Sequence, residues 1–392
     1  SRGNGMSFQV KQHSSILDID ATAWNVLAAD SPFLRHEFLG ALERTGCVGE
    51  DTTWKPTHLT VTDVDGNLTG ALPLYVKYDS QGEFVFDWSW AAAYQRNGID
   101  YYPKLITAIP FTPCYGPRQL FAAHLDESEQ LSLTRDSLSA IKQLASQYNA
   151  SGWHGLFLEG QLLEQQAFSE LSYRLGTQYH WFNHNFSCFE DFLDTFSSRK
   201  RKNLRKERSK IIQQNIQHRF ISGSELTDDL LDQFYQFYQI TYLKRGRQCY
   251  LNQTFFKLLR DTLAEQLHIC FAFDLNYSDK NPVAAAMFLQ GESTLYGRYW
   301  GAQAEYDSLH FETCYYQGIE YCIRHQLQRF DPGAQGEHKI QRGFEPRLTY
   351  SQHGLTDPRF AAAVDNFLTE ETPGVKSYQR ECRNYLPFKN TD

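Results

Sequence analysis

The stretch RYWGAQAEYDSLHFETCYYQGIEYCI, residues 298–323, decides the fold of this 392-residue chain. It begins inside a strand-like run, TLYGRYWGA at 294–302, whose side chains alternate between two faces. After Ser308, a predicted N-cap, the apolar period changes to that of a helix. The helical stripe consists of Phe311, Cys314, Tyr315, Ile319, Cys322 and Ile323. Because the run QRFDPGA at 328–334 reads as a further strand, the stretch predicts a strand, a helix and a strand in succession.

The rest of the second half extends this order. Ahead of the stretch come a strand, two helical patterns and two more strands, the last of which joins 294–302 through a hairpin turn at 291–293. These elements are expected at 217–223, 225–243, 252–267, 268–274 and 283–290. The predicted order is therefore strand, two helices, three antiparallel strands, helix, strand.

The first half follows a similar order more loosely, with a turn at Asp65 and Gly66. Its elements are expected at 20–29, 33–45, 57–63, 68–78, 127–149, 155–160, 162–175 and 178–188. The two halves predict an α/β (α+β) protein of two related domains, each a mostly antiparallel mixed sheet flanked by helices. We place the domains at 6–190 and 191–392, with a basic helix at 197–212 opening the second. Residues 1–5, SRGNG, are interpreted as the remnant of an expression tag.

Charge and composition exclude some classes of protein. The chain has a formal net charge of -8, yet residues 197–210 hold eight Lys or Arg side chains and one Glu. An acidic protein with one local cationic segment is not expected to bind duplex DNA. The sequence contains no apolar run of about 18 residues and no secretory leader pattern, so neither a transmembrane helix nor secretion is predicted. Eight scattered cysteines without a C-x-x-C pair favour reduced thiols in the cytoplasm.

Several long motifs carry a family resemblance. They are residues 298–323 together with SPFLRHEFLGALERTG (31–46), FDWSWAAAYQRNGIDYYPKL (86–105), IPFTPCYGPR (109–118) and DPGAQGEHKIQRGFEP (331–346). Over about residues 30–385 the chain resembles the FemAB-like family of N-acyltransferases, the peptidoglycan biosynthesis/recognition group, and its second half resembles a GNAT-type acyltransferase domain. The resemblance implies two tandem GNAT-like domains. It also implies that aminoacyl-tRNA and phosphate-bearing cell-wall precursors are substrates, although a fold does not fix a function.

The basic segment has two interpretations. A solvated helix face is one, since charged faces are common. The other is an anion site, because like charges at i,i+4 repel and a bound anion would offset that repulsion. The resemblance favours a tRNA or phosphate ligand, since FemAB-type transferases carry a basic helix at this point. Arg201, Arg205 and Arg208 fall on one side at helical spacing and are the predicted anion-binding residues.

The loop before the helix bears on the acyl donor. QAEYDSLHFE at 303–312 lies where acetyl-CoA-dependent GNAT enzymes have a glycine-bearing pyrophosphate loop. Here the loop carries Glu305 and Asp307 and lacks the R-x-x-G-x-G/A pattern, which disfavours coenzyme A. We therefore expect no tightly bound cofactor, and a donor co-substrate that is aminoacyl-tRNA or, as the alternative, acyl-CoA.

The candidate catalytic residues are His310, Glu312, Glu337 and His338. An N-acyltransferase must take a proton from an attacking amine, and a histidine or carboxylate can accept it. The alternative for His310 and Glu312 is a helix N-terminus with no function, where an acid is favoured by the dipole. A metal site built from these four residues and His353 is a rival, but no pair has H-E-x-x-H spacing, so no metal is predicted.

The candidate substrate-binding residues lie in both halves. Lys339 and Arg342 follow the catalytic candidates and are predicted to hold anionic groups. Arg298 and Trp300 share one strand face, and Arg298 needs a partner, either Glu337 or a substrate carboxylate. Asp87, Trp90 and Arg118 are predicted to line a groove in the first half, with ordinary core packing as the alternative.

The leading hypothesis is a cytoplasmic N-acyltransferase that passes an acyl or aminoacyl group to a small-molecule or peptide amine. An acyl-CoA-dependent GNAT enzyme is one alternative. A non-catalytic module that recognises a cell-wall precursor or nucleotide is the other.

Overall fold

The computed structural model describes residues 7–28, 30–159, 168, 170–334 and 336–390. The chain forms two compact units, unit 1 from residues 1–176 and 349–376, and unit 2 from residues 177–348 and 377–392. The divisions fall inside three elements, β9 (Ser172–Phe182), β15 (Glu345–Leu355) and α12 (Pro358–Arg383). The units thus differ from the predicted division at residue 190, because β15 and the first part of α12 return the chain to unit 1. The predicted tag remnant at 1–5 lies outside the described residues.

Unit 1 places its described strands in two sets. One is ordered β1-β3-β4-β7, and in the other β15 is followed by β8, β6, β5 and β2. The strands are β1 (Gln9–His13), β2 (Trp54–Pro56), β3 (His58–Thr62), β4 (Leu68–Leu72), β5 (Tyr75–Lys77), β6 (Lys104–Thr107), β7 (Leu120–Phe121) and β8 (Gly152–Leu158). The helices are η1 (Ile16–Asp18), α1 (Ala21–Ala28), η2 (Pro32–Leu34), α2 (His36–Arg44), α3 (Trp88–Arg96) and α4 (Glu127–Gln147).

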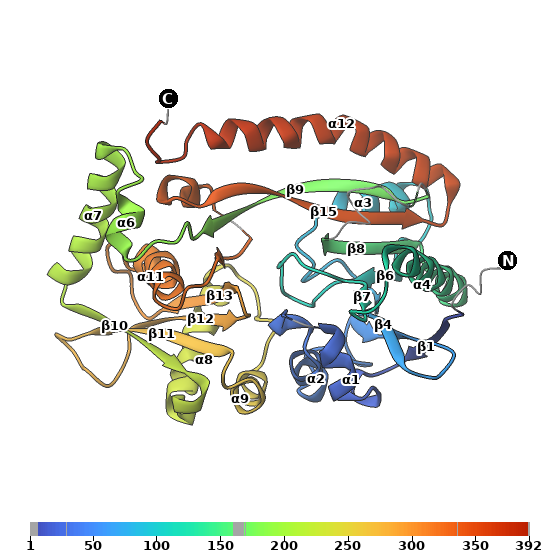
Figure 1. Cartoon of the computed structure of the whole chain (residues 1–392), viewed down its shortest axis with the longest axis horizontal. Coiled ribbons are helices and arrows are strands. Elements are labelled where there is room, and N and C mark those ends of the chain that lie inside the picture. The colour runs from blue at the N-terminus through green and yellow to red at the C-terminus, as the bar shows by residue number, and fades with distance from the viewer. Residues whose placement is uncertain (1–6, 29, 160–167, 169, 335, 391–392) are drawn as a thin grey trace. The chain divides into compact units, whose positions relative to one another are not determined.

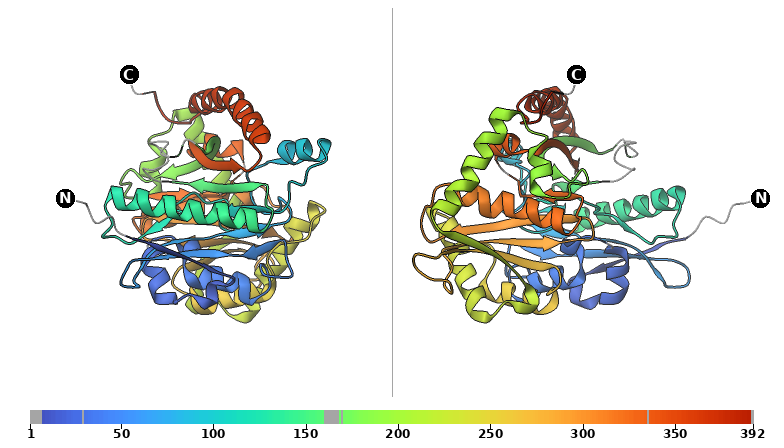
Figure 2. Two further views of the ribbon diagram at one scale, coloured as in Figure 1. Left: turned by 90° about the vertical axis from the view of Figure 1, so that its right-hand side faces the viewer. Right: turned by 60° about the vertical axis from the view of Figure 1, so that its left-hand side comes forward.

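Helix α4 connects the parallel strands β6 and β8 and packs on the sheet of unit 1 (Figures 1 and 2). It begins with a capping box, in which the Asp126 side chain accepts from the Glu129 backbone and the Glu129 side chain accepts from that of Asp126. Its apolar face, with Leu138, Ile141 and Leu144, joins the core under the sheet. The helix expected at 162–175 falls largely outside the described residues, and 172–175 belong to the paired strand β9 instead.

Unit 2 has the predicted order of elements. Strands β10 to β13 form an antiparallel meander, β14 pairs in parallel with β13, and β9 follows β14. The strands are β10 (Ile216–Ser222), β11 (Leu267–Asp274), β12 (Ala284–Gln290), β13 (Thr294–Ala302) and β14 (Arg329–Asp331). The helices are α6 (Phe189–Leu193), α7 (Ser198–Gln213), η3 (Gly223–Glu225), α8 (Asp228–Lys244), α9 (Gln253–Thr262), α10 (Leu309–Phe311), the π-helical η4 (Glu312–Tyr316), α11 (Gln317–Arg324) and the 3-10 helix η5 (Glu337–Arg342).

Helices α8 and α11 lie on the two faces of the unit 2 sheet (Figure 1). Each of these helices packs closely on the sheet at a glycine. A Cβ on Gly301 would lie 1.9 Å from the backbone oxygen of Phe237 in α8, and one on Gly318 would lie 2.4 Å from the Phe330 ring. The core between α11 and the sheet is rich in aromatic side chains, including Trp181, Phe288 and Tyr316.

The helix expected to start at Ser308 is broken into three pieces. Ser308 occupies the predicted N-cap position, but it has a φ of 64° and its hydroxyl donates to Asp307, so its side chain makes no capping hydrogen bond. The π-helical turn η4 interrupts the α-helical period, and such turns are frequent at functional sites. No helix in the described part of the chain has the length and apolarity needed to cross a membrane.

Candidate functional site

The candidate site in unit 2 begins where strands β13 and β14 stop pairing. Their parallel register covers three positions and ends at Tyr296 opposite Asp331. Just beyond, the register between β12 and β13 shifts, since Ala286 pairs with Trp300 but Phe288 pairs with Gly297. Residues 298 and 299 of β13 therefore oppose one residue of β12. A bulge of this kind bends a strand and changes where its side chains point.

Arg298, in that bulge, forms a buried ion pair with Asp331 at the end of β14. Its two terminal nitrogens lie 3.2 and 2.9 Å from the two carboxylate oxygens, and the side chains are 3% and 0% exposed. Burial opposes ionisation of Asp331, but Arg298 and His180 hold its pKa below the ordinary value. The prediction that Glu337 is the partner of Arg298 is therefore wrong, because both terminal nitrogens of the guanidinium bind the carboxylate of Asp331.

Unit 2 also contains a surface cavity of about 690 Å³. Helix η5 supplies one wall and the C-terminal end of α12 supplies the other. The lining residues are Phe311, Glu337, His338, Ile340, Gln341, Arg342, Tyr378, Glu381, Cys382 and Tyr385. The structure thus brings three sequence-predicted residues, Glu337, His338 and Arg342, into one cavity.

Glu337 is oriented by a tyrosine. The hydroxyl of Tyr378 lies 2.8 Å from a Glu337 carboxylate oxygen, and it also lies 2.6 Å from the hydroxyl of Tyr179. Burial and these hydrogen bonds raise the pKa of Tyr378 above its ordinary value. The phenol therefore stays protonated and donates to the carboxylate at any pH near neutrality.

Lys339 points away from solvent. Its ammonium donates to the backbone oxygen of Gly333 at 3.1 Å, and the side chain is almost fully buried. Burial lowers its pKa to about 8, opposed by Asp331 and assisted by Arg298. The ammonium is therefore held by a backbone oxygen, near enough to Arg298 and Asp331 to be affected by their charges, and Lys339 does not line the cavity.

Arg342 is engaged within the protein. Its guanidinium lies 2.8 Å from one carboxylate oxygen of Glu207 and 3.2 Å from the other, and it stacks on the Phe311 ring at 3.5 Å. It also donates to the backbone oxygen of His338 at 2.8 Å. These contacts fix the cavity wall and leave Arg342 neutralised, which differs from the anion-binding role expected from the sequence.

His310 lies among aromatic rings. Its ring centroid is 5.2 Å from that of Trp300 and 5.7 Å from that of Phe311, and the Phe311 centroid lies 6.1 Å from that of His338. Burial lowers the pKa of His310 to about 4, assisted by the positive charges of Lys339 and Arg342. The imidazole is therefore neutral at pH 7. Two candidate proton acceptors, His310 and His338, are thus separated by one phenylalanine.

Glu312 has different neighbours from His310. Arg208 grips both of its carboxylate oxygens at 3.0 and 3.1 Å, and Gln317 donates to it at 3.2 Å. Burial raises its pKa, although Arg208 opposes that effect. The π-helical turn η4 therefore directs His310 and Glu312 to different partners, and Glu312 does not line the cavity.

Family comparison assigns the chain. A family model described as peptidoglycan biosynthesis/recognition, FemAB_like, matches residues 15–390. The chain belongs to the FemAB-like family. No curated protein matches the sequence. Family membership, with the order of elements in unit 2, confirms the predicted fold of tandem GNAT-like domains and supports an acyl- or aminoacyltransferase related to peptidoglycan.

Solved structures share the fold at low identity. FemX is 11% identical over 91% of this chain and 100% of that chain, with a TM-score of 0.53. The C-terminal domain of a putative lysylphosphatidylglycerol synthetase from Agrobacterium fabrum is 13% identical over 91% and 97%, with a TM-score of 0.50. A conserved protein of unknown function from Bacteroides thetaiotaomicron is 10% identical over 89% and 100%, with a TM-score of 0.51. These likenesses concern the fold alone.

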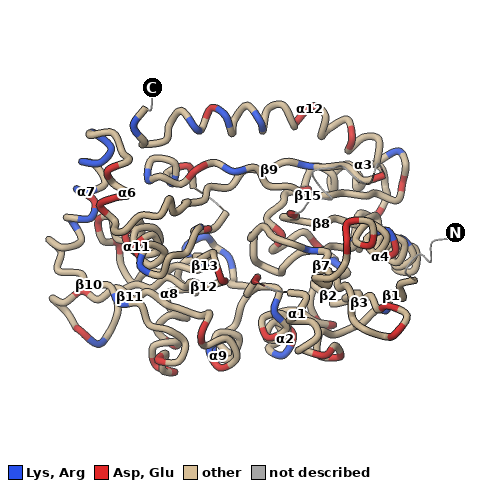
Figure 3. The backbone as a smooth tube through the Cα atoms, viewed as in Figure 1, with Lys and Arg blue, Asp and Glu red and all other residues tan. Residues whose placement is uncertain are grey.

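Figure 3 shows Lys and Arg along helix α7 of this FemAB-like chain. One side of this helix is anchored within unit 2. Arg208 binds Glu312 and Glu320, Arg205 pairs with Glu190 at 2.6 Å, and Arg201 donates to the backbone oxygen of Phe196. All three residues predicted to bind an anion thus have partners within unit 2.

The opposite side of α7 carries the exposed cations Arg199, Lys202 and Lys206. None of the three has an ion pair within the described part of the chain. Their spacing of three and four residues places them on one helical face, over about 10 Å along the axis. The cations that an anion could reach therefore lie on the opposite face of α7 from the three arginines that the sequence predicted.

The predicted groove residues of unit 1 are buried in its interior. Asp87 accepts from Lys104 at 2.7 Å and also from the Tyr101 hydroxyl. Trp90 lies with its ring centroid 4.9 Å from that of His353, and Arg118 donates to the backbone oxygen of Cys114. All three side chains are thus bound within unit 1, and none of Asp87, Trp90 and Arg118 lines the cavity described above.

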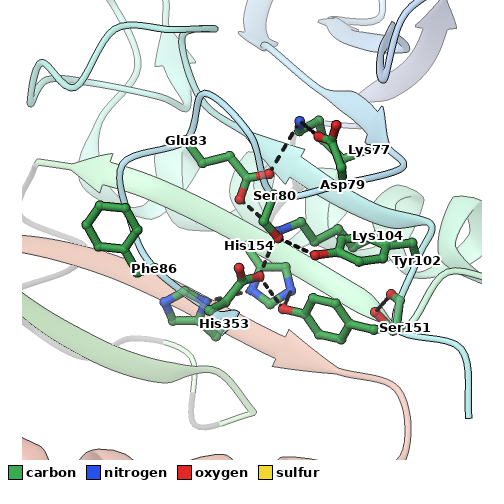
Figure 4. A network of polar contacts seen from close by, with 12 residues as sticks. Lys77, Asp79, Ser80, Glu83, Phe86, Tyr102, Lys104, Ser151, His154 and His353 are labelled. Carbon is green, nitrogen blue, oxygen red and sulfur yellow. Dashed lines mark hydrogen bonds and ion pairs between the residues drawn. The ribbon is translucent and has the colours of Figure 1, made fainter. Parts of the chain in front are cut away.

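Asp87 pairs with Lys104 in a network of buried charges that the sequence did not predict. Figure 4 shows Lys104, Glu83 and Lys77 of this network. Lys104 bridges Asp87 and Glu83, each at 2.7 Å, and Lys77 lies 3.5 Å from Glu83. Burial raises the pKa of Glu83 to about 7, opposed by the two lysines. Burial also lowers the pKa of the neighbouring His154 to about 3. The network therefore combines ionised and neutral groups inside unit 1.

Two further observations complete the site. Within the described residues, no group of three or more His, Cys, Asp or Glu side chains could hold a metal ion. The cavity wall from the end of α12 and the turn after it was not predicted, although Tyr378, Cys382 and Tyr385 recur at i, i+4 and i+7. That helical spacing was the signal that could have located the wall.

Proposed function

We propose that this FemAB-like chain is an N-acyltransferase that passes an acyl or aminoacyl group to an amine, with aminoacyl-tRNA as the donor. The observation that carries the proposal is the opening between β13 and β14 in unit 2. The strands pair over three positions and stop pairing ahead of a bulge in β13, and the cavity that holds Glu337 and His338 lies in the same unit. A bulged strand can direct a backbone N–H at a carbonyl oxygen and stabilise the charge that develops there.

The chemistry requires one bond to form and one to break. The amine nitrogen bonds to the carbonyl carbon, the ester bond to the ribose oxygen of the tRNA breaks, and the ribose oxygen takes up a proton. The acceptor must first lose its ammonium proton. In the proposal Glu337 or His338 takes that proton at the cavity, and the neutral His310 is a second acceptor further inside.

Two observations favour tRNA over coenzyme A. The loop ahead of α10 carries the carboxylates of Glu305 and Asp307, and Asp307 is paired with Lys210 at 3.2 Å. Like charge there disfavours a pyrophosphate. In addition, Arg199, Lys202 and Lys206 form an exposed cationic face on α7 that suits a phosphate backbone. Use of aminoacyl-tRNA also implies that the reaction takes place in the cytoplasm.

The proposal is tested by a transfer assay with three donors. The purified chain is incubated with labelled aminoacyl-tRNA, deacylated tRNA or acetyl-CoA, and with a panel of amines, amino sugars and cell-wall precursor peptides. We expect labelled product only with aminoacyl-tRNA, and a loss of about 10² to 10⁴ in rate when the proton acceptor is removed.

Glu337→Gln and His338→Ala are the test variants, and the exposed Glu370→Gln on α12 is the matched control. Transfer from acetyl-CoA alone would overturn the choice of donor. Tight binding of a precursor, with no transfer from any of the donors, would favour a recognition module and contradict the proposal that the chain is an enzyme.

A further inference from the structure

Helix α3 of unit 1 ends at the pair Asn97–Gly98. Asn97 is the C-cap, and Gly98 has a φ of 67°, a left-handed conformation that favours glycine. The Gly98 N–H donates to the backbone oxygen of Gln95 at 3.0 Å. The Ile99 N–H donates to that of Tyr94 at the same distance. These two bonds form a Schellman motif, so the way in which α3 ends depends on the glycine.

An asparagine that precedes a glycine is chemically labile. The backbone nitrogen of the next residue can attack the side-chain carbonyl carbon, and a glycine has no side chain to obstruct that approach. Asn97 and Gly98 are both exposed to water. The sequence has a second such pair at 4–5, which lies outside the described residues. The end of α3 therefore combines a labile pair with a defined structure.

The reaction is a deamidation in two steps. The backbone nitrogen of Gly98 bonds to Cγ of Asn97 and gives up its proton, while the bond from Cγ to Nδ2 breaks and that nitrogen leaves as ammonia. Water then opens the resulting succinimide at one of its two carbonyl carbons. The product is aspartate or isoaspartate, and isoaspartate places an additional methylene group in the backbone.

The end of α3 ties both reacting groups to other partners. The Asn97 side chain turns back along the helix, where Nδ2 donates to the backbone oxygen of Ala93 at 2.7 Å. The Gly98 nitrogen is held by its bond to Gln95. Both hydrogen bonds have to break before the nitrogen can reach the carbonyl carbon. The reaction is therefore restrained in the folded chain and released when this helix end opens.

The products do not restore the helix end. Aspartate lacks the Nδ2 donor and adds a negative charge at a helix C-terminus, where the helix dipole disfavours it. Isoaspartate lengthens the backbone ahead of Gly98 and changes the spacing of the motif. The motif holds Tyr94, whose ring stacks on Phe360 of α12 with centroids 3.7 Å apart, and Ile99 packs in the same apolar cluster. Reaction at Asn97 therefore loosens the contact between α3 and α12.

We propose that Asn97 is a deamidation site that reacts when the end of α3 opens, and that its products keep this end open. The site thus records local unfolding of unit 1 in a covalent change. The reaction needs only water, so the inference does not depend on the proposed function.

Peptide mass spectrometry tests the site. The full chain is incubated at mildly alkaline pH, either folded or unfolded in urea, and is then digested with a protease that cuts after lysine. Residues 78–104 are released as one peptide, in which Asn97 is the only asparagine. We expect deamidation in both states, slower in the folded chain by about tenfold or more, because two hydrogen bonds must first break. Equal rates in the two states, or an Asn97 that stays intact in either, would overturn the proposal.

Two variants separate the loss of the cap from the added charge. Asn97→Asp reproduces one product, and Gln95→Glu is the matched control, because it adds the same charge to the same turn but keeps the Asn97 amide. Circular dichroism checks that both variants fold. The amides of Gly98 and Ile99 should exchange with solvent about fivefold faster in Asn97→Asp than in Gln95→Glu, because only the former loses a hydrogen bond to the backbone. Equal exchange in the two variants would overturn the proposal that the products keep this end open.

Discussion

Arg298 and Asp331 form a buried, two-pronged ion pair that joins the bulge of β13 to the last residue of β14. The pair lies where the two strands stop pairing. The same arginine lies 2.7 Å from the backbone oxygen of its neighbour Gly297. The ion pair therefore ties together the two sides of the opening that we propose receives the acyl donor.

Arg298→Met should lower the free energy of unfolding by about 3–5 kcal/mol, because it leaves the Asp331 carboxylate buried without a counter-charge. Combining it with Asp331→Asn should restore part of that loss. Urea unfolding measures both, and Arg324→Met, an exposed arginine in the same unit, is the control. An Arg298→Met variant as stable as the parent chain would contradict the importance given to this pair.

Glu83 should make the stability of the chain fall as the pH rises towards 7. Its folded pKa of about 7 exceeds the unfolded value of about 4.3, so between these values the folded chain holds a proton that the unfolded chain has lost. Glu83→Gln removes this effect. The free energy of unfolding of the variant relative to the parent should therefore rise by up to about 1.4 kcal/mol per pH unit in that window.

Denaturant unfolding at a series of pH values between about 4.5 and 7, which spans the two pKa values, measures the difference. Glu50→Gln, an exposed acid of unit 1, should show no such slope. A flat difference between Glu83→Gln and the parent chain would mean that Glu83 is ionised throughout.

Local patterns predicted the order of elements in unit 2 because strands and helices there differ clearly in period. The turn at 291–293 and the strands around it follow from alternating apolar residues. The local patterns did not predict that each unit consists of two separate segments. The chain returns to unit 1 with β15, which pairs with the distant strand β8, and with the first part of α12. The π-helical turn at η4 also has no signal in a simple helical period.

The sequence indicated which polar residues gather at the candidate site, but it did not indicate their partners. Glu337 and His338 lie in one cavity, as their density of polar groups suggested. The partners of Arg298, Arg342 and Arg208 are acids from other elements, and no spacing along the chain predicts such pairs. Charged residues in the sequence therefore indicated where the candidate site lies. Whether each charge is free to bind a ligand could be seen only in the folded structure.

Tyr378→Phe should reduce acyl transfer with little effect on folding. The variant removes the hydrogen bond that orients Glu337 but keeps the ring. Loss of one such bond to a charged group is worth about 1.5–3 kcal/mol, so kcat/KM should fall by roughly tenfold to a hundredfold. The change should also shift the pH profile of transfer, which a purely structural role would not do.

Tyr277→Phe, which removes an exposed hydroxyl elsewhere in unit 2, is the matched control. An unchanged rate and pH profile in Tyr378→Phe would show that Glu337 is oriented without it.

Reversing the exposed face of α7 should weaken binding of tRNA. The triple variant Arg199→Glu, Lys202→Glu, Lys206→Glu changes three cations that have no ion pair in the described part of the chain. For each phosphate that the variant no longer binds, the slope of log affinity against log salt should decrease by about 0.7 to 0.9, or about 2 to 3 in all. Filter binding over a range of salt concentrations measures the slope.

The matched control is the triple variant Arg96→Glu, Arg135→Glu, Lys280→Glu. It makes the same change in net charge away from α7 and should leave the slope intact. Equal effects of the two triple variants would mean that total charge, and not this face of α7, attracts the tRNA.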